Sequence, residues 1–144
     1  MAPNSEKEKI EISQYILEHV PKEAEVTRIE YEGPTLAVYT KRPEILVEQS
    51  NLIADIVNII RKRIVIRSDP SVRLLENEAE KITREIISPE AEITDISFDP
   101  SLGEIIIEAK KPGIVIGRNG TVLQEIIKRT RWRPYVLRSP PLRS

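Results

Sequence analysis

One sequence pattern occurs twice in this chain, and no other feature constrains its fold as strongly. Residues 23–32 read EAEVTRIEYE, and residues 90–99 read EAEITDISFD. Further along, Lys-Arg-Pro at 41–43 recurs as Lys-Lys-Pro at 110–112, and each is followed after one residue by an apolar triplet. A repeat at this distance is typical of a chain built from homologous structural units.

The repeat predicts two modules, at residues 1–69 and 70–144. Each copy ends on an apolar run followed by Arg-Ser, at 64–68 and at 135–139. The offset between the copies grows from 67 to about 71, as small loop insertions would produce. We expect the junction near Asp69-Pro70-Ser71, because proline disfavours helix in the residue before it.

Hydrophobic periodicity predicts the same element order, α-β-β-α-α-β, in each module. Apolar residues at helical spacing indicate a first helix, and alternation indicates two strands. A proline then suits the first turn of a short helix, and a longer helix and a last strand follow. This order gives an α+β fold in which helices cover a small sheet. The expected longer helices lie around 12–20, 75–87, 52–61 and 121–131, and the first two strands of each module around 26–31, 35–40, 93–98 and 104–109.

The stretch 115–120, VIGRNG, carries the clearest chemical signature in the chain. Its two glycines let the backbone turn tightly and come close to a ligand, because neither has a Cβ. The Arg and Asn between them suit contact with a sugar-phosphate backbone. Residues 70–109 carry 3 Lys/Arg and 10 Asp/Glu, whereas residues 110–144 carry 9 Lys/Arg and one Glu. A run of charged residues usually forms only a solvent-exposed face. Here the basic residues surround a loop that suits phosphate contact, and this combination favours nucleic-acid binding.

Composition excludes several classes of protein. The chain has no cysteine, which excludes disulfides and thiolate metal sites. It contains no apolar segment near the roughly 18 residues that a membrane helix needs, and residues 1–9 do not read as a signal peptide. We therefore expect a cytoplasmic protein with no membrane partner. Walker, metal-cluster and Ser-His-Asp patterns are absent, so we expect no enzymatic activity and no cofactor in this chain.

A module of this order with Ile-Gly-Arg-Asn-Gly between its middle helices resembles a type-II KH domain, and the resemblance covers nearly the whole chain as two tandem modules. The stretch 110–120, KKPGIVIGRNG, followed by RWRP at 131–134, resembles the N-terminal region of archaeal homologues of the cleavage and polyadenylation specificity factor. Those proteins are β-CASP metallo-β-lactamase ribonucleases that carry two KH domains ahead of the nuclease. By this resemblance, the catalytic domain would begin near residues 138–144.

The resemblance implies binding of single-stranded RNA, U-rich and near a 3′ end, and its delivery to the nuclease in RNA processing and transcription termination. It places two zinc ions in the nuclease and none in this chain. The nuclease domain of the full-length protein would be a further partner, and a homodimer is a further expectation. Two alternatives stay open: the tandem KH region of another transcription- or ribosome-associated protein, and a pair of interaction modules that orient a dimer and bind RNA weakly.

In a KH domain the G-x-x-G loop holds the backbone of about four nucleotides. By resemblance, the glycines permit close approach, Arg118 pairs with phosphate, and Asn119 hydrogen-bonds phosphate or sugar. The start of the next helix attracts the anion, and Thr121 caps that helix or donates to phosphate. The two lysines before the short helix extend the contact. The candidate RNA-binding residues are Gly117, Arg118, Asn119, Gly120, Thr121, Lys110, Lys111 and Ile116.

The first module departs from the KH pattern. Residues 48–51, Glu-Gln-Ser-Asn, stand where the second module has its G-x-x-G loop. Both glycines are absent and Glu48 would repel phosphate, so we expect a degenerate module used for packing, orientation or dimer contact. Two further residues carry expectations. Trp132 is interpreted as a packing residue, with base stacking as the alternative, and His19 is expected in or partly in the core.

Overall fold

The computed structural model describes residues 2–141, with side chains from residue 6 onward. Residues 142–144 of the predicted second module lie outside the described residues. The chain divides into two compact units, one ending at Arg67 and the other beginning at Ser68. The division falls beside the expected junction at 69/70, and each unit is described by itself.

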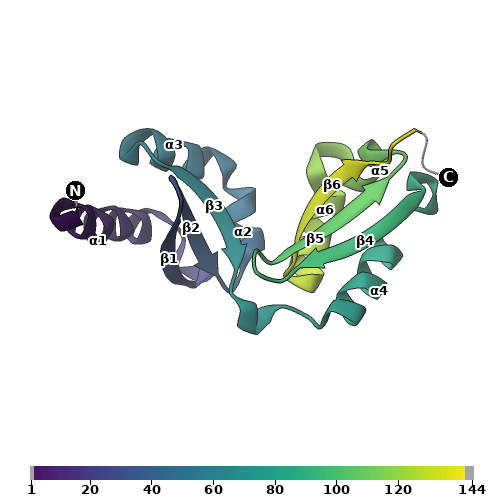
Figure 1. The fold of residues 1–144 in the computed structure, drawn as a ribbon, viewed down its shortest axis with the longest axis horizontal. Helices are drawn as coiled ribbons and strands as arrows, with labels where there is room; N and C mark the ends of the chain where they lie inside the picture. Colours follow the sequence, from purple (N-terminus) through teal and green to yellow (C-terminus); the bar gives the residue numbers. More distant parts are fainter. Residues whose placement is uncertain (1, 142–144) are drawn as a thin grey trace. The chain divides into compact units, whose positions relative to one another are not determined.

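The first unit builds a three-stranded sheet in the order β1-β2-β3, in which β1 and β2 are antiparallel. A long helix precedes the sheet, and two helices stand between its second and third strands (Figure 1). Its elements are α1 (Ala2–His19), β1 (Val26–Glu32), β2 (Thr35–Thr40), α2 (Pro43–Glu48), α3 (Ser50–Ile60) and β3 (Arg63–Ser68).

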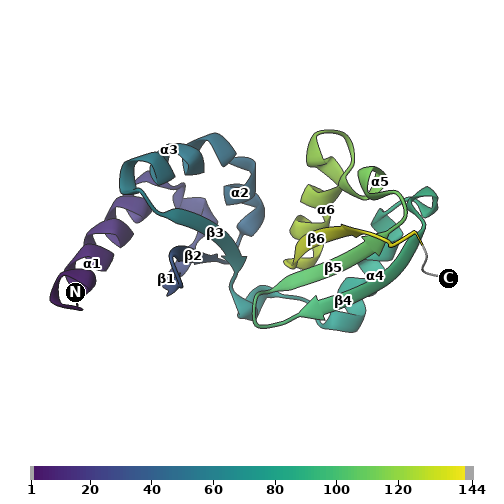
Figure 2. The same ribbon diagram turned by 45° about the horizontal axis from the view of Figure 1, so that its top comes forward.

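The second unit repeats this order and forms a sheet β4-β5-β6, with β5 antiparallel to β4 and parallel to β6. Figure 2 shows α5 and α6 in the crossover that makes the last pairing parallel. Its elements are α4 (Glu76–Ile86), β4 (Ile93–Asp99), β5 (Glu104–Ala109), α5 (Pro112–Ile116), α6 (Thr121–Thr130) and β6 (Arg133–Arg138). The predicted fold class, α+β with two tandem KH-like modules, is confirmed.

The sequence repeat reappears in the backbone. A short 3-10 helix precedes the first strand of each sheet, at Lys22–Ala24 and at Pro89–Ala91. The residue after each, Glu25 or Glu92, adopts a left-handed conformation with φ of 55° or 56°. Its carbonyl accepts a hydrogen bond from the residue that follows the second strand, over 3.1 Å from Lys41 N and 3.0 Å from Lys110 N. The sequence Glu-Ala-Glu, which both copies share at 23–25 and 90–92, therefore forms the same turn in each module.

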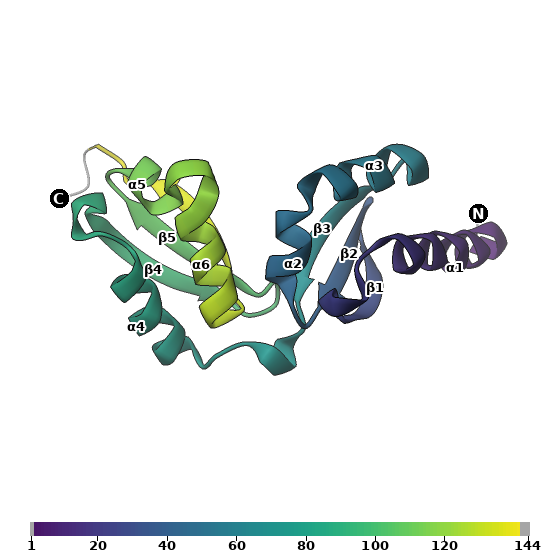
Figure 3. The same cartoon turned by 180° about the vertical axis from the view of Figure 1, so that it is seen from behind.

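Each unit has its own apolar core between its sheet and helices. In Figure 3, α4 and α6 lie on one face of the second sheet. Trp132 belongs to this core: it is 4% exposed, and its Nε1 donates to Leu74 O over 2.8 Å. Its ring meets Phe98 edge-on at 4.9 Å. The packing interpretation of Trp132 is confirmed, and stacking of its ring on a base is wrong for this conformation because the ring is covered.

The expectation for His19 is wrong, because its side chain is exposed. The buried positions of α1 are Ile12 and Ile16, with Val20 just after the helix. Their four-residue spacing puts them on one face. Position 19 lies at the edge of this face, about 60° around the axis from Ile16, and it is the last residue of the helix, where its side chain is exposed. The His19 ring instead stacks on Tyr15 at 4.0 Å, with Nδ1 2.8 Å from the Tyr15 carbonyl oxygen.

Arg73 anchors the segment that opens the second unit. Its guanidinium donates to Ser68 O and to Pro100 O, each over 2.8 Å. The guanidinium fills the space beside Gly103, where a Cβ would come within 2.6 Å of it. Glycine at this turn therefore lets one arginine join the start of the unit to the β4–β5 connection.

A charged pair ties β1 to β3 in the first unit. Arg67 donates to Glu32 through Nη2 over 2.9 Å and through Nε over 3.3 Å. The Arg67 side chain is 8% exposed and that of Glu32 is 29% exposed. The hydrogen bond from Arg67 holds the pKa of Glu32 below its ordinary value of 4.5, and it outweighs the desolvation that would raise this pKa.

This pair predicts an acid-sensitive first unit. Because the folded-state pKa of Glu32 is depressed, its contribution to stability is present above about pH 4.5 and is lost as pH falls through the folded-state value. Glu32→Gln should weaken the first unit at neutral pH and flatten the pH dependence of its urea midpoint, followed through its amide NMR signals. Glu48→Gln, at an exposed site, should keep the wild-type pH dependence, and equal flattening by both would contradict the assignment to Glu32.

Candidate nucleic-acid interface

The turn between α5 and α6 depends on three left-handed residues within four positions. Gly117 has φ 79° and ψ 169°, Asn119 has φ 57° and ψ 26°, and Gly120 has φ 75° and ψ 17°. Glycine adopts such values without the steric cost that a Cβ brings, and Asn tolerates them better than most residues. The loop conformation of Asn119 was missed at the sequence level, although its residue type was a signal for it.

The two glycines serve different purposes. A Cβ at Gly117 would stand 2.4 Å from Val122 Cγ2 and 2.9 Å from the Val122 nitrogen, so this glycine lets the loop pack against the first turn of α6. Apart from Gly120 and its two chain neighbours, no residue has an atom within 4 Å of the corresponding position at Gly120. Of the two, Gly120 is therefore the residue whose backbone leaves open room for a ligand.

Exposed polar side chains surround this turn. Arg118, Asn119 and Thr121 are exposed, and Ile116 is 39% exposed although its neighbour Val115 is fully buried. Among residues 6–141, no hydrogen bond or ion pair engages the guanidinium of Arg118 or the side-chain amide of Asn119. The structure thus brings together six of the eight candidate residues, Ile116 to Thr121, at one junction.

Lys110 and Lys111 lie at the other end of α5. This helix has five residues, so about 7 Å of helix axis separates its two ends. Both lysines are exposed, and the Lys111 ammonium lies 3.4 Å from Glu92 Oε2. They are therefore peripheral to the turn, and an acidic neighbour partly offsets the charge of Lys111.

The start of α6 carries no side-chain cap. Gly120 occupies the N-cap position, and the Thr121 backbone N–H donates to Arg118 O. The expectation that Thr121 caps this helix is wrong, because Thr121 is already inside it in a right-handed helical conformation. Its hydroxyl is exposed beside the first-turn N–H groups, which favour an anion.

The first module has no such loop. Its α2 ends at Glu48 and α3 begins at Ser50, so only Gln49 separates them, with φ −98° and ψ 45°. Residues 48–51, which correspond in sequence to the G-x-x-G loop of the second module, are therefore almost entirely helical. Without glycine the chain does not enter the left-handed region there, and it kinks at one residue instead.

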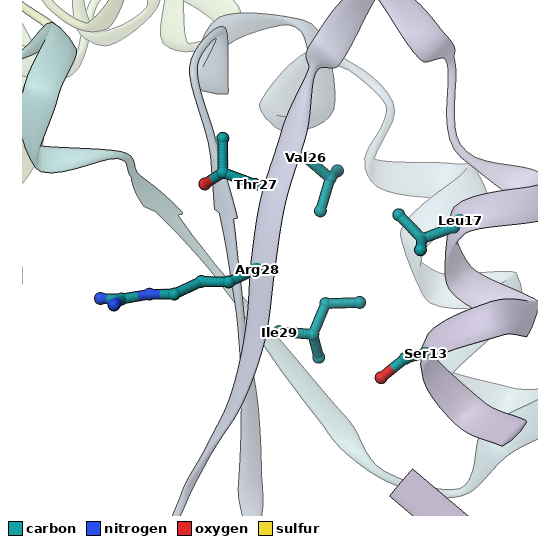
Figure 4. A pocket seen from close by; sticks show the side chains of 6 residues that line it. All are labelled: Ser13, Leu17, Val26, Thr27, Arg28 and Ile29. Carbon is teal, nitrogen blue, oxygen red and sulfur yellow. The ribbon is translucent and has the colours of Figure 1, made fainter. Parts of the chain in front are cut away.

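A small hollow lies elsewhere, between α1 and the edge strand β1 (Figure 4). Its volume is about 130 Å³. Leu17, Val26 and Ile29 face one another across it, whereas Thr27 and Arg28 point away from it. Since few polar groups converge on this space, it does not have the character of a small-molecule site.

Two further properties concern the described part of the chain. Residues 6–141 contain no group of three or more His, Asp or Glu side chains placed to hold a metal ion. None of the helices within residues 2–141 is both long and apolar enough to cross a bilayer.

Comparison with known proteins identifies related sequences. The family described as "Transcription termination factor FttA, KH domain" matches residues 6–73. Transcription termination factor FttA of Pyrococcus horikoshii is 54% identical over 125 residues, covering 87% of this chain and 19% of the relative. The Thermococcus kodakarensis protein of that name is 46% identical over 134 residues, and the Methanothermobacter thermautotrophicus one is 49% identical over 134; each match covers 93% of this chain and 21% of the relative.

The chain therefore spans about a fifth of the length of these relatives. One solved structure, the crystal structure of APE1850, aligns with a TM-score of 0.33 and 16% identity, over 79% of this chain and 86% of that one. The family match falls on the first module, including the segment that lacks the G-x-x-G loop.

The contrasting surroundings of the two glycines predict unequal costs of substitution. Gly120→Ala should lower the free energy of unfolding by about 1 kcal/mol, since only the left-handed conformation is strained. Gly117→Ala should cost at least about 3 kcal/mol, because its conformation is reserved for glycine and its Cβ would overlap Val122. Urea unfolding followed by the fluorescence of Trp132, in the core of the same unit, measures both. Equal costs would contradict the different roles.

Proposed function

We propose that this chain, a KH-domain region similar to that of archaeal transcription termination factor FttA, binds single-stranded RNA through its second module. The observation that carries the proposal is the turn at residues 117–120, with its left-handed backbone and its exposed Arg and Asn. The RNA backbone enters beside Gly120, where no protein atom occupies the space next to the main chain.

Each neighbouring group has a role in this proposal. Arg118 pairs with a phosphate, and Asn119 hydrogen-bonds phosphate or ribose. N–H groups in the first turn of α6 face the same anion, and the helix dipole adds to the attraction. The exposed part of Ile116 contacts a sugar or base next to the gripped phosphate, and Lys110 and Lys111 extend the attraction along α5.

We propose a different role for the first module. It keeps the fold, but a near-continuous helix replaces the turn, and Glu48 is exposed where the second module has glycine. A carboxylate at that position repels phosphate. We therefore assign packing, orientation or dimer contact to this module.

The role in the longer protein is part of the same proposal. The matched relatives are about five times longer than this chain, which leaves room for further domains. From the resemblance of residues 110–134 to the β-CASP ribonuclease family, we propose that one of them is a metallo-β-lactamase/β-CASP nuclease. The KH region would guide U-rich 3′-end RNA to it during termination in the archaeal cytoplasm. Zinc would supply hydrolytic chemistry in that nuclease. The described residues of this chain do not form a metal site, so no step is assigned to zinc here.

A matched pair of substitutions at Gly120 tests the RNA site. Asp and Asn have nearly the same shape, both tolerate the left-handed conformation, and the space beside Gly120 is open. Gly120→Asp should weaken binding of a labelled oligouridine by at least about tenfold, because it places a carboxylate against phosphate. Gly120→Asn should retain most of the affinity. Fluorescence anisotropy measures both, and unfolding curves verify the fold.

Equal affinities for the Asp and Asn variants would contradict a phosphate contact at this turn. Chemical-shift mapping with the same RNA locates the binding surface independently. The perturbed amides should cluster at residues 116–121. Perturbations confined to the first module would contradict the assignment of the two modules.

Salt dependence provides a second test. For single strands, the logarithm of the binding constant falls by about 0.7 for each phosphate contact per tenfold rise in salt. Arg118→Ala should therefore reduce this slope by about 0.7 as well as weaken binding. Arg84→Ala removes an exposed arginine that is paired with Glu80 on α4, and it should leave the slope unchanged. An unaltered slope in the Arg118 variant would show that this side chain does not contact phosphate.

A further inference from the structure

The face of the second sheet that points away from its helices is strongly acidic. The strand register defines it, because the alternate residues face the core. We call this surface the outer face. It consists of Asp95, Ser97 and Asp99 on β4, Glu104, Ile106 and Glu108 on β5, and Arg133, Tyr135 and Leu137 on β6.

Two pairs of carboxylates stand directly opposite each other on the outer face. Asp95 pairs with Glu108, and Asp99 pairs with Glu104. Like charges opposite each other on neighbouring strands destabilise a sheet. Asp99 has a structural task, since its Oδ1 accepts hydrogen bonds from Ser101 in the following turn. Glu108 Oε2 accepts a hydrogen bond from Thr94 Oγ1 over 3.0 Å. On β6, Arg133 lies beside Glu104 and Leu137 lies beside Glu108.

An apolar strip runs along the same face. Tyr135 is 54% exposed and Leu137 is 40% exposed, and Ile106 lies directly beside Tyr135 in the register. Carboxylates thus flank an exposed aromatic and aliphatic patch on a rigid sheet. An apolar centre with charges around it is the composition of a protein-binding surface rather than of a free sheet face.

The first module shows that the fold does not require these charges. At the positions that match Asp95 and Glu108, it has Arg28 and Tyr39, and the Arg28 guanidinium lies 4.0 Å from the centre of the Tyr39 ring. Its Glu32 pairs with Arg67. The first module therefore builds the same register without a pair of carboxylates at these opposed positions.

We propose that the outer face of the second module binds a partner protein whose contact surface has an apolar centre and a rim of Lys or Arg. Charge complementarity selects this partner: the face carries four carboxylates and one arginine. RNA is disfavoured there, because the same charges repel phosphate. The inference stands independently of RNA binding, which is assigned to the turn between α5 and α6.

A defined probe tests the chemistry of this surface. A blocked peptide of alternating lysine and valine, titrated into the labelled full chain, should perturb the amide signals of Ser97, Ile106 and Tyr135. The double variant Asp95→Asn/Glu108→Gln should weaken peptide binding by about threefold to tenfold. The same variant should raise the Tm of the second unit by about 2–4 °C, because it removes a like-charge pair. Its affinity for oligouridine should not fall.

The matched control neutralises two carboxylates elsewhere in the same unit. Glu76→Gln/Glu78→Gln changes the exposed first turn of α4 and should leave peptide binding intact. Tyr135→Ser should weaken the peptide without changing the net charge, which separates the apolar contribution. Equal weakening by both double variants would overturn the proposal. So would outer-face perturbations by oligouridine, or by dilution of the chain alone, which would indicate RNA or a second copy as the occupant.

Discussion

The contact between Gly117 and Val122 is the constraint on which the candidate RNA site depends. Because Gly117 has no Cβ, the backbone that follows α5 can pack directly against Val122 in the first turn of α6. The next residues then turn outward through left-handed conformations, which exposes Arg118 and Asn119 and keeps open room beside Gly120. Close packing on one side of the turn thus produces an accessible backbone on the other.

The two modules separate what this fold needs from what a function needs. They share the entry turn at Glu25 and Glu92, the strand register and the element order. They differ between the middle helices and on the outer faces of their sheets, where no core packing limits the choice of residue. A duplicated fold can therefore place phosphate-binding chemistry on one copy and protein-binding chemistry on a different surface of that copy.

Much of the fold could be predicted, because periodicity and repetition are properties of the chain itself. The element order and the packing of Trp132 were predicted correctly. The hydrogen bond from the Trp132 indole to the Leu74 carbonyl oxygen was not predicted. The errors concerned His19 and Thr121. Both residues lie at the end of a helix, where a shift of one residue decides exposure and capping, and periodicity does not fix that boundary.

Local chemistry in the sequence determined that the chain folds as two similar α+β modules, and that only the second has the glycines for an open turn. Those outcomes follow from side-chain periodicity and from the absence of a Cβ, which do not require knowledge of distant contacts. Tertiary structure alone decided that Gly117 is needed for packing while Gly120 leaves room for a ligand. It also decided that Asp95 and Glu108 stand opposite each other, because strand register brings together residues that the sequence keeps apart.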